Sequence, residues 1–432
     1  MDSTKRTDAI AMTQDKPIPQ PGCDDYDPNS LTVEQAMSRI AESIDPIAGA
    51  ESVALRAALG RTLDEDVLSP IDVPPYTNSA MDGYALRGTD LPGQGETRLQ
   101  VIGTALAGQP FESAVGAGQC VRIMTGAKMP EGADTVVMQE HTEREDDIVR
   151  IGSGHLPGQN VRAAGEDLAR GKPVLARGKR LGPADIGLLA SLGVPEVRVK
   201  RRLRVAFFST GDELRSLGEP LEDGQIYDSN RYTLHGLLTE LGAELIDMGV
   251  VRDRPEDVEA AFAQAAGSAD AVITSGGVSV GEADYVKDTL ERLGEVGFWK
   301  IAMKPGRPLA FGRVGRAYFF GLPGNPVSVM ATFYELVLPA LRRLMGNEQT
   351  QPVSLTVPCA ERLKKRPGRV DFQRGILTRQ ADGTLVVRST GAQGSHILSS
   401  MSRANCFIVL PSDWGDVEPG TPVEVQPFEG LL

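Results

Sequence analysis

The sequence predicts a multidomain α/β plus β protein, in which a doubly wound α/β/α domain is flanked by mostly-β domains. Its 432 residues are enough for about three domains. Between residues 203 and 344, continuous apolar runs alternate with segments of helical period, which is typical of strands joined by crossover helices. On both sides of this region, short alternating strands are separated by Gly and Pro turns, which predicts small β domains.

The N-terminal part of the chain predicts one helix and then short strands. Thr32 and Gln35 fit a capping box at the start of a helix over residues 32–44. We expect short strands at residues 53–59, 61–67, 98–103, 119–123, 135–138 and 148–151, and a helix over 183–192 that begins at a proline and ends before Gly193.

The central region predicts a mostly parallel sheet covered by helices on both faces. The expected strands are residues 203–209, 244–251, 269–275, 296–302 and 317–320. The expected helices are residues 229–241, 256–266, 284–293 and 327–345.

These segments divide the chain into five predicted parts. They are a disordered tail (1–28), a mixed α/β linker domain (29–68 and 165–200), a β domain (69–164), the α/β/α domain (201–347) and a C-terminal β-barrel (348–432).

Charge and composition exclude several classes of protein. The chain carries 45 Lys and Arg against 58 Asp and Glu, a net charge of −13, whereas a general nucleic-acid binder needs net or clustered positive charge. No apolar run is long enough for a transmembrane helix, so no membrane partner is expected. The first 25 residues are polar and contain three prolines, which is unlike a signal peptide. The four scattered cysteines form no C-x-x-C pair, so reduced thiols and a cytoplasmic location are expected.

Ligands of a doubly wound sheet bind outside the carboxyl ends of its strands. Four predicted loops lie at such ends: residues 209–214, 252–254, 275–285 and 321–326. Their glycines allow backbone N–H groups to approach an anion closely. Any one of these loops can equally be a simple tight turn, but four at the same edge favour a binding site.

The charged residues of these loops suit phosphoryl or pyrophosphate chemistry with a divalent metal. Asp212, Glu213, Asp253 and Asp284 supply the hard oxygen ligands that Mg²⁺ prefers, although Asp284 can also be a simple helix N-cap. The segment 299–308 adds Lys300, Lys304 and Arg307, which would concentrate positive charge for an anionic substrate. Neither a P-loop nor a G-x-G-x-x-G motif is present.

Taken together, the loops resemble one family. The strings STGDEL, SGGVSVGEADY, KPGRP and GLPGNPVS occur in this order, as they do in the molybdopterin molybdenumtransferases, the MoeA family, which includes the E domain of gephyrin. The upstream strings NSAMDGYA (78–85), RIMTGA (122–127) and GED (165–167) resemble the β domain of the same family. The resemblance runs from about residue 31 to the C-terminus and implies that the α/β/α domain is MogA-like.

The resemblance implies an activity and an assembly. Members of the family insert molybdate into adenylated molybdopterin and release AMP, the last common step of molybdenum cofactor biosynthesis. Mg²⁺ is their usual metal ion. They are homodimers whose active site lies between the α/β domain of one subunit and the β domain of the other. An adenylyltransferase must supply the substrate to this chain, because no such domain is fused to it.

The resemblance also implies site residues at the positions that match. The catalytic candidates are Asp82, Glu213, Asp253, Asp284, Lys300 and Lys304, of which Glu213, Asp253 and Asp284 are the metal candidates. The substrate-binding candidates are Thr125, Arg162, Asp167, Ser275, Gly276, Gly277, Arg307, Pro323, Gly324, Asn325 and Pro326. The two lysines would hold molybdate or the pyrophosphate.

Two departures from the family pattern and two alternatives accompany this prediction. Residues 74–77 read PPYT where an aromatic followed by an acidic residue is expected, and Arg307 replaces a lysine found in many members. The alternatives are the adenylyltransferase itself and a non-catalytic scaffold on the same fold. The flanking β domains argue against the first, and the retention of Asp284, Lys300 and Lys304 argues against the second.

Overall fold

The computed structural model describes residues 29–276, 289–290, 292–347 and 352–428. They divide into two compact units, of which one comprises residues 48–201 and 346–347 and the other the remaining described residues. We refer to them as the β unit and the α/β unit. In the described part of the chain, no helix is long and apolar enough to cross a membrane.

The α/β unit is built on a six-stranded sheet with the strand order β16-β13-β17-β21-β20-β18. Its strands are β13 (Arg204–Thr210), β16 (Glu244–Val251), β17 (Ala271–Ser275), β18 (Gly294–Lys300), β20 (Pro308–Val314) and β21 (Ala317–Leu322). The first four strands in the sheet order run parallel, whereas β20 is antiparallel to both of its neighbours. The sheet is therefore mostly parallel, as predicted.

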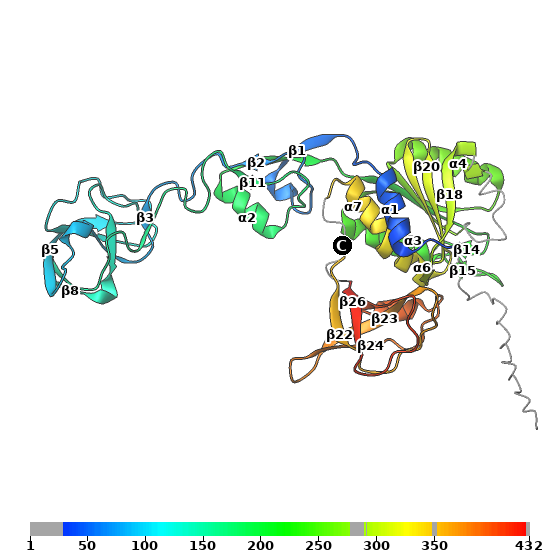
Figure 1. Ribbon diagram of the computed structural model, residues 1–432. Coiled ribbons are helices and arrows are strands. Elements are labelled where there is room, and N and C mark those ends of the chain that lie inside the picture. The colour runs from blue at the N-terminus through cyan, green and yellow to red at the C-terminus, as the bar shows by residue number, and fades with distance from the viewer. Residues whose placement is uncertain (1–28, 277–288, 291, 348–351, 429–432) are drawn as a thin grey trace, which may run out of the picture. The chain divides into compact units, whose positions relative to one another are not determined.

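Helices cover both faces of this sheet, which confirms the doubly wound prediction (Figure 1). Phe207 and Phe208 illustrate the reason, because successive residues of a strand point to opposite faces. Phe207 lies in the core under α3 and α6, and Phe208 packs edge-on against Phe262 of α4. The helices are α1 (Val33–Ser43), α3 (Ser229–Leu241), α4 (Pro255–Ser268), α6 (Pro326–Thr332) and α7 (Leu338–Leu344).

The predicted capping box at the start of α1 is present. The Thr32 hydroxyl accepts a hydrogen bond from the Gln35 amide at 3.2 Å, and the Gln35 side chain accepts one from the Thr32 amide at 3.0 Å. These bonds satisfy two N–H groups that a helix start otherwise leaves unpaired.

A second six-stranded sheet forms the C-terminal part of the α/β unit. The order is β19-β23-β25-β26-β22, with β24 added to β23. The strands are β19 (Met303–Lys304), β22 (Leu355–Pro358), β23 (Val370–Arg379), β24 (Leu385–Ser389), β25 (Cys406–Leu410) and β26 (Pro422–Pro427), and the helix α8 is Leu398–Arg403. Next to β22, Cys359 forms an isolated bridge to Val387 of β24. Whether the sheet closes into the predicted barrel stays a prediction.

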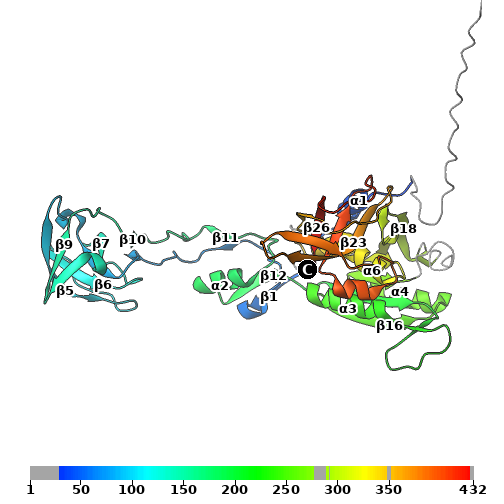
Figure 2. The same cartoon turned by 90° about the horizontal axis from the view of Figure 1, so that it is seen from below.

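The β unit contains a third six-stranded sheet, in the order β7-β4-β6-β5-β9-β8. Its strands are β4 (Gly83–Leu86), β5 (Glu96–Ala105), β6 (Gln119–Ile123), β7 (Thr135–Met138), β8 (Thr142–Glu145) and β9 (Ile148–Gly152). Three two-stranded sheets join β1 (Ala50–Ala54) to β12 (Glu196–Lys200), β2 (Val67–Leu68) to β11 (Pro173–Leu175), and β3 (Asn78–Ser79) to β10 (Val161–Arg162). Helix α2 (Pro183–Ser191) packs beside β1 and β12 (Figure 2).

Three predicted elements differ from the structure. Residues 53–59 do not form one strand, because β1 ends at Ala54 and the 3₁₀-helix η1 (Leu55–Ala57) follows. Residues 61–66 form no strand, since Thr62 and Leu63 make only isolated bridges, and β2 begins at Val67. The predicted helix at 327–345 contains a π-helical turn, η4 (Phe333–Val337), between α6 and α7. Strand β20 is not among the predicted elements, and most of the predicted helix at 284–293 lies outside the described residues.

Replacing Gly236 by alanine should stabilise the protein. Gly236 lies in the interior of α3, and an added Cβ would meet no atom within 4 Å. Alanine restricts the unfolded chain more than glycine, so the free energy of unfolding should rise by about 0.5–1 kcal/mol. Urea denaturation measures this value. Gly242→Ala is the matched control and should destabilise, because Gly242 ends α3 at φ +85.

Candidate functional site

Asp82 and Thr125 form a polar pair in the β unit. Asp82 Oδ1 accepts hydrogen bonds from both the backbone N–H and the hydroxyl of Thr125, each at 2.7 Å. The two bonds hold the pKa of Asp82 below its ordinary value, and the positive charge of Arg122 lowers it further. Asp82 is therefore a fixed carboxylate at neutral pH.

Two of the three motifs of the β unit meet around this pair, and the third lies beside the PPYT segment. The Gly126 amide donates to the Ser79 carbonyl at 2.8 Å, and the Ser79 amide donates to the Ala127 carbonyl at 3.0 Å. Arg162 lies opposite Asn78 in the β3–β10 pair. The backbone of Asp167 donates to the Val73 carbonyl at 3.0 Å, which places it beside the start of the PPYT segment. Asp82, Thr125 and Arg162 thus belong to one region although 80 residues of sequence separate the first from the last.

In the α/β unit, the predicted loops lie along one edge of the sheet. Strands β13, β16, β17 and β21 are parallel, so their carboxyl ends meet at this edge. Strand β18 runs in the same direction as β21, because each is antiparallel to β20 between them. Lys300, the last residue of β18, therefore lies at the same edge. Arg307 precedes β20 and Pro323 follows β21, and the register pairs Ala310 with Gly321, so both residues lie at this edge.

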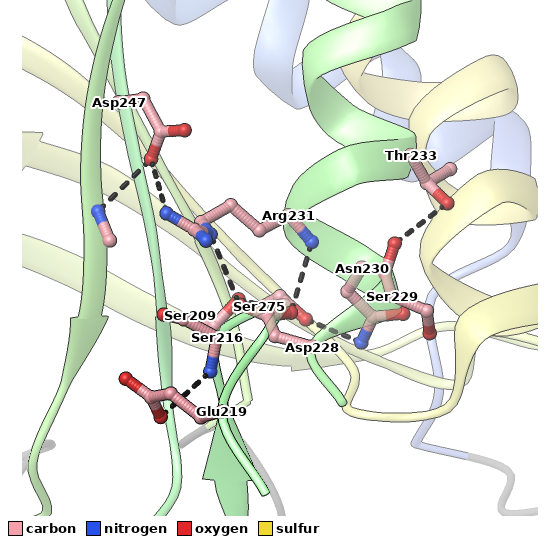
Figure 3. A network of polar contacts seen from close by, with 11 residues as sticks. Ser209, Ser216, Glu219, Asp228, Ser229, Asn230, Arg231, Thr233, Asp247 and Ser275 are labelled. Carbon is pink, nitrogen blue, oxygen red and sulfur yellow. Dashed lines mark hydrogen bonds and ion pairs between the residues drawn. The ribbon is translucent and has the colours of Figure 1, made fainter. Parts of the chain in front are cut away.

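A network of hydrogen bonds and ion pairs between side chains connects the elements at this edge (Figure 3). Asp228 is 1% exposed and accepts hydrogen bonds from the Ser209 hydroxyl and the Arg231 amide, both at 3.1 Å. The Arg231 guanidinium lies 3.5 Å from Asp228 and 3.2 Å from Asp247. A buried carboxylate needs such partners, so the end of β13 and the start of α3 are tied together.

Asn230 joins two of the predicted substrate loops. Its side-chain amide donates to the Ser275 hydroxyl and to the Gly324 carbonyl, each at 2.7 Å. The Gly276 amide adds a bond to the Leu322 carbonyl at 3.1 Å. The hydroxyl of Thr210 is buried next to them and has no hydrogen-bond partner among the described residues.

The acidic candidates lie at the same edge. The carboxylate of Glu213 folds back over Gly211 at the end of β13, because a Cβ added to Gly211 would lie 2.5 Å from it. Asp212 Oδ1 accepts a hydrogen bond from the Asp253 amide at 3.4 Å, which connects the first two loops. Among the described residues, no three His, Cys, Asp or Glu side chains are grouped closely enough to hold a metal ion. Gly277 and Asp284 lie outside the described residues.

The second lysine candidate marks the junction with the C-terminal sheet. Lys304 lies in β19, which pairs in parallel with β23 and places Lys304 beside Asp371. The Ile301 amide donates to the Arg307 carbonyl at 2.7 Å, which closes the loop between Lys300 and Arg307. Segments of both sheets thus contribute to one continuous region of the α/β unit.

The structure adds residues that the sequence did not indicate. Asp228, Asn230 and Arg231 form the string DSNR at a helix start, which sequence alone presents only as a cap. In the C-terminal sheet, the fully buried Arg374 donates to the Gly394 carbonyl at 3.0 Å and holds the loop whose Ser395 carbonyl accepts from the first turn of α6. No short motif links these distant segments, so only the fold reveals the contact.

Thr125→Val should raise the pKa of Asp82 toward its ordinary value. The substitution removes the hydroxyl donor and retains the backbone donor, so part of the shift should remain. Because the folded pKa is lowered, the stabilisation by these bonds exists above the unfolded pKa and is lost as pH falls through the folded value. Carboxyl ¹³C NMR titration measures the shift. Thr239→Val, which removes a hydroxyl bond to the His235 carbonyl in α3 of the α/β unit, should leave the pKa of Asp82 unchanged.

Three family models match successive parts of the chain. They are the MoeA N-terminal region (domain I and II) at residues 31–193, a probable molybdopterin binding domain at 206–343, and the MoeA C-terminal region (domain IV) at 356–428.

Relatives and solved structures agree with these models. The chain is 48% identical to a molybdopterin molybdenumtransferase of Haemophilus influenzae over 93% of its own length and 100% of the relative's. It is 39% identical to a molybdopterin molybdenumtransferase of Nostoc sp. over 86% and 87% of the two chains. The crystal structure of a molybdopterin biosynthesis moeA protein from Pyrococcus horikoshii matches with a TM-score of 0.81 and 30% identity, and covers 92% of this chain and 100% of that one. The chain therefore belongs to the MoeA family.

Proposed function

We propose that this protein inserts molybdate into adenylated molybdopterin and releases AMP. The observation that carries the proposal is the single edge of the α/β sheet, where the carboxyl ends of four parallel strands meet Lys300. Both substrates are anions, and a protein of net charge −13 must bind them with local positive charge and backbone N–H groups. The relatives named molybdopterin molybdenumtransferase support the same activity.

The lysines and the loops would bind and orient the substrates. Lys300 and Lys304 would hold the oxygens of molybdate or of the pyrophosphate by charge-assisted hydrogen bonds. Asn230 would keep the Ser275 and Gly324 loops at a fixed distance, so that the substrate meets a preformed surface. Arg307 would offer a planar pair of donors in place of the point charge of a lysine.

The carboxylates would contribute one or two ligands to a magnesium ion, and substrate phosphates would supply others. Glu213 and Asp253, with Asp284 from the sequence, offer hard oxygen ligands, and Mg²⁺ commonly binds one or two carboxylates together with substrate phosphates. When bound, the ion would offset the negative charge that builds up on the phosphate oxygens as the pyrophosphate bond breaks. On the β domain, Asp82, Thr125, Arg162 and Asp167 would contact the substrate from the opposite side.

We also propose the cellular setting that the resemblance implies. The protein would act in the cytoplasm as a homodimer, and each site would combine the sheet edge of one subunit with the β domain of the other. A separate adenylyltransferase would supply the adenylated substrate.

Mixing two inactive variants tests the shared site. Asp82→Asn and Lys300→Ala should each abolish turnover alone, since they remove opposite halves of the site. Subunit exchange between them should restore up to about a quarter of the wild-type rate, because half of the dimers would then carry one intact site of two. No recovery after demonstrated exchange, or a mass near 46 kDa by light scattering at all concentrations, would contradict the shared site.

The activity itself is tested by AMP release from adenylated molybdopterin with Mg²⁺. Molybdate-dependent release supports the proposal. AMP release at the same rate with and without molybdate argues against the proposed activity. So does the absence of AMP release by a folded protein that binds the substrate.

A further inference from the structure

A basic cavity of about 360 Å³ lies where Lys304 meets the C-terminal sheet. Its lining consists of Lys304, Lys364, Lys365, Arg366, Pro367, Arg369, Asp371 and Asp416. Five cations against two carboxylates give the lining a net charge of +3, in a chain whose net charge is −13. Such a concentration of like charge in a concave site raises the local concentration of anions.

The two carboxylates of the lining are already engaged. Asp416 accepts hydrogen bonds from the Lys365 amide at 2.9 Å and from the Arg362 guanidinium at 3.0 Å. Asp371 accepts from the Gln373 side chain at 3.0 Å. They therefore shape the cavity without neutralising all five cations.

Hydrogen bonds fix the position of the positively charged Lys365 side chain in the cavity. Its side chain is buried, with 5% of the residue exposed, and its ammonium donates to the carbonyls of Arg366 and Arg369, each at 2.8 Å. An ammonium has three N–H donors, so these two bonds account for two of them. Burial lowers the pKa of Lys365; Asp371 opposes this shift, whereas Lys304 and Arg369 lower the pKa further. An anion in the cavity would relieve that repulsion.

We propose that this cavity binds the phosphate monoester that AMP release leaves on the pterin product. The inference rests on the proposed function. In that reaction water adds to one phosphorus, the P–O–P bond breaks, and AMP leaves, while the pterin keeps its own phosphate as a monoester. This phosphate then carries up to two negative charges instead of the one it carries within the pyrophosphate. Cationic side chains that surround it would favour the product over the substrate at this position.

Lys304 connects the cavity to the proposed active site. Its backbone pairs with Asp371 at the start of β23, and it follows β18 by only four residues. A phosphate bound against Lys304 would keep the molybdenum-loaded product on the α/β unit after AMP has left.

Direct binding of inorganic phosphate tests the proposal without requiring turnover. The full-length protein is titrated calorimetrically at low salt, and one site per chain is expected. The test variant is the pair Lys364→Gln and Arg366→Gln, because these exposed side chains form no hydrogen bond with another described residue. The control is the pair Arg379→Gln and Arg388→Gln, which removes two exposed charges from the same domain outside the cavity.

The test pair should bind phosphate at least about tenfold more weakly, and the control pair should bind as the wild type does. Affinity should also rise as pH rises through the second pKa of inorganic phosphate, because the dianion then predominates. Equal binding by wild type and test pair overturns the proposal. Sulfate binding as tightly as phosphate overturns the assignment to a phosphate monoester and indicates a general oxyanion site.

These experiments distinguish a failure of the proposed function from a failure of the cavity assignment. If the chain releases no AMP but the test pair still loses phosphate binding, only the activity is contradicted. If AMP release is molybdate-dependent but the test pair binds phosphate normally, only the cavity assignment is contradicted.

Discussion

Lys300→Ala is expected to reduce molybdate-dependent AMP release by at least about 100-fold while the protein remains folded. Removing one donor that stabilises developing charge commonly costs this much. Lys300 ends β18 at the edge where the parallel strands also end, and its backbone carbonyl accepts the Leu31 amide at 2.8 Å. The substitution leaves that backbone bond in place, so the loss should appear in turnover and not in the melting temperature.

Lys172→Ala is the control for this prediction. Lys172 is an exposed lysine of the β unit, outside every loop assigned to the site, and its loss should change neither turnover nor stability. A Lys300→Ala protein with wild-type AMP release would remove Lys300 from the site. An unfolded variant would instead make Lys300 a structural residue, which thermal denaturation distinguishes.

Gly276→Ala should both destabilise the protein and lower its activity by tenfold or more. Gly276 has a φ of +92, and an added Cβ would lie 2.7 Å from the backbone oxygen of Thr210. A backbone oxygen cannot move away by a change of rotamer, as the end of a flexible side chain can. Strands β13 and β17 would therefore have to separate. The expected loss of stability is roughly 1–3 kcal/mol. The separation would also displace the Ser275 hydroxyl from Asn230.

Gly324→Ala provides the comparison at the same edge. An added Cβ at Gly324 meets nothing within 4 Å, so the free energy of unfolding should stay within about 0.5 kcal/mol of the wild type. Urea denaturation of both variants measures the contrast. Equal stability of the two variants would show that the β13–β17 edge is less constrained than this geometry implies.

The central domain could be predicted from the sequence because its strands are buried on both faces. Their apolar runs are continuous, and the helices between them carry clear start and stop signals, such as Gly242 after α3. The matched family strings supplied the site candidates. Strand β20 was not predicted because its first residue, Pro308, belongs to the KPGRP string, which was interpreted as a site loop.

Contacts between distant segments could not be predicted. Asn230 is one polar residue in a helical first turn, and its bonds to Ser275 and Gly324 depend on the order of the strands. The basic cavity combines Lys304 with residues 364–371, which no short motif contains. Local pattern thus indicated which residues carry charge, whereas the pairing of β19 with β23 decides which of them meet.

The most direct test of the proposed activity is AMP release from adenylated molybdopterin by the purified protein with Mg²⁺. Three parallel reactions contain molybdate, no added oxyanion, or sulfate, which is also a tetrahedral dianion. We predict rapid AMP release with molybdate alone, one molybdenum bound to the pterin for each AMP formed, and loss of both products in Lys300→Ala. AMP release that is equal in all three reactions, or absent from a folded wild-type protein that binds the substrate, would contradict molybdenum insertion by this chain.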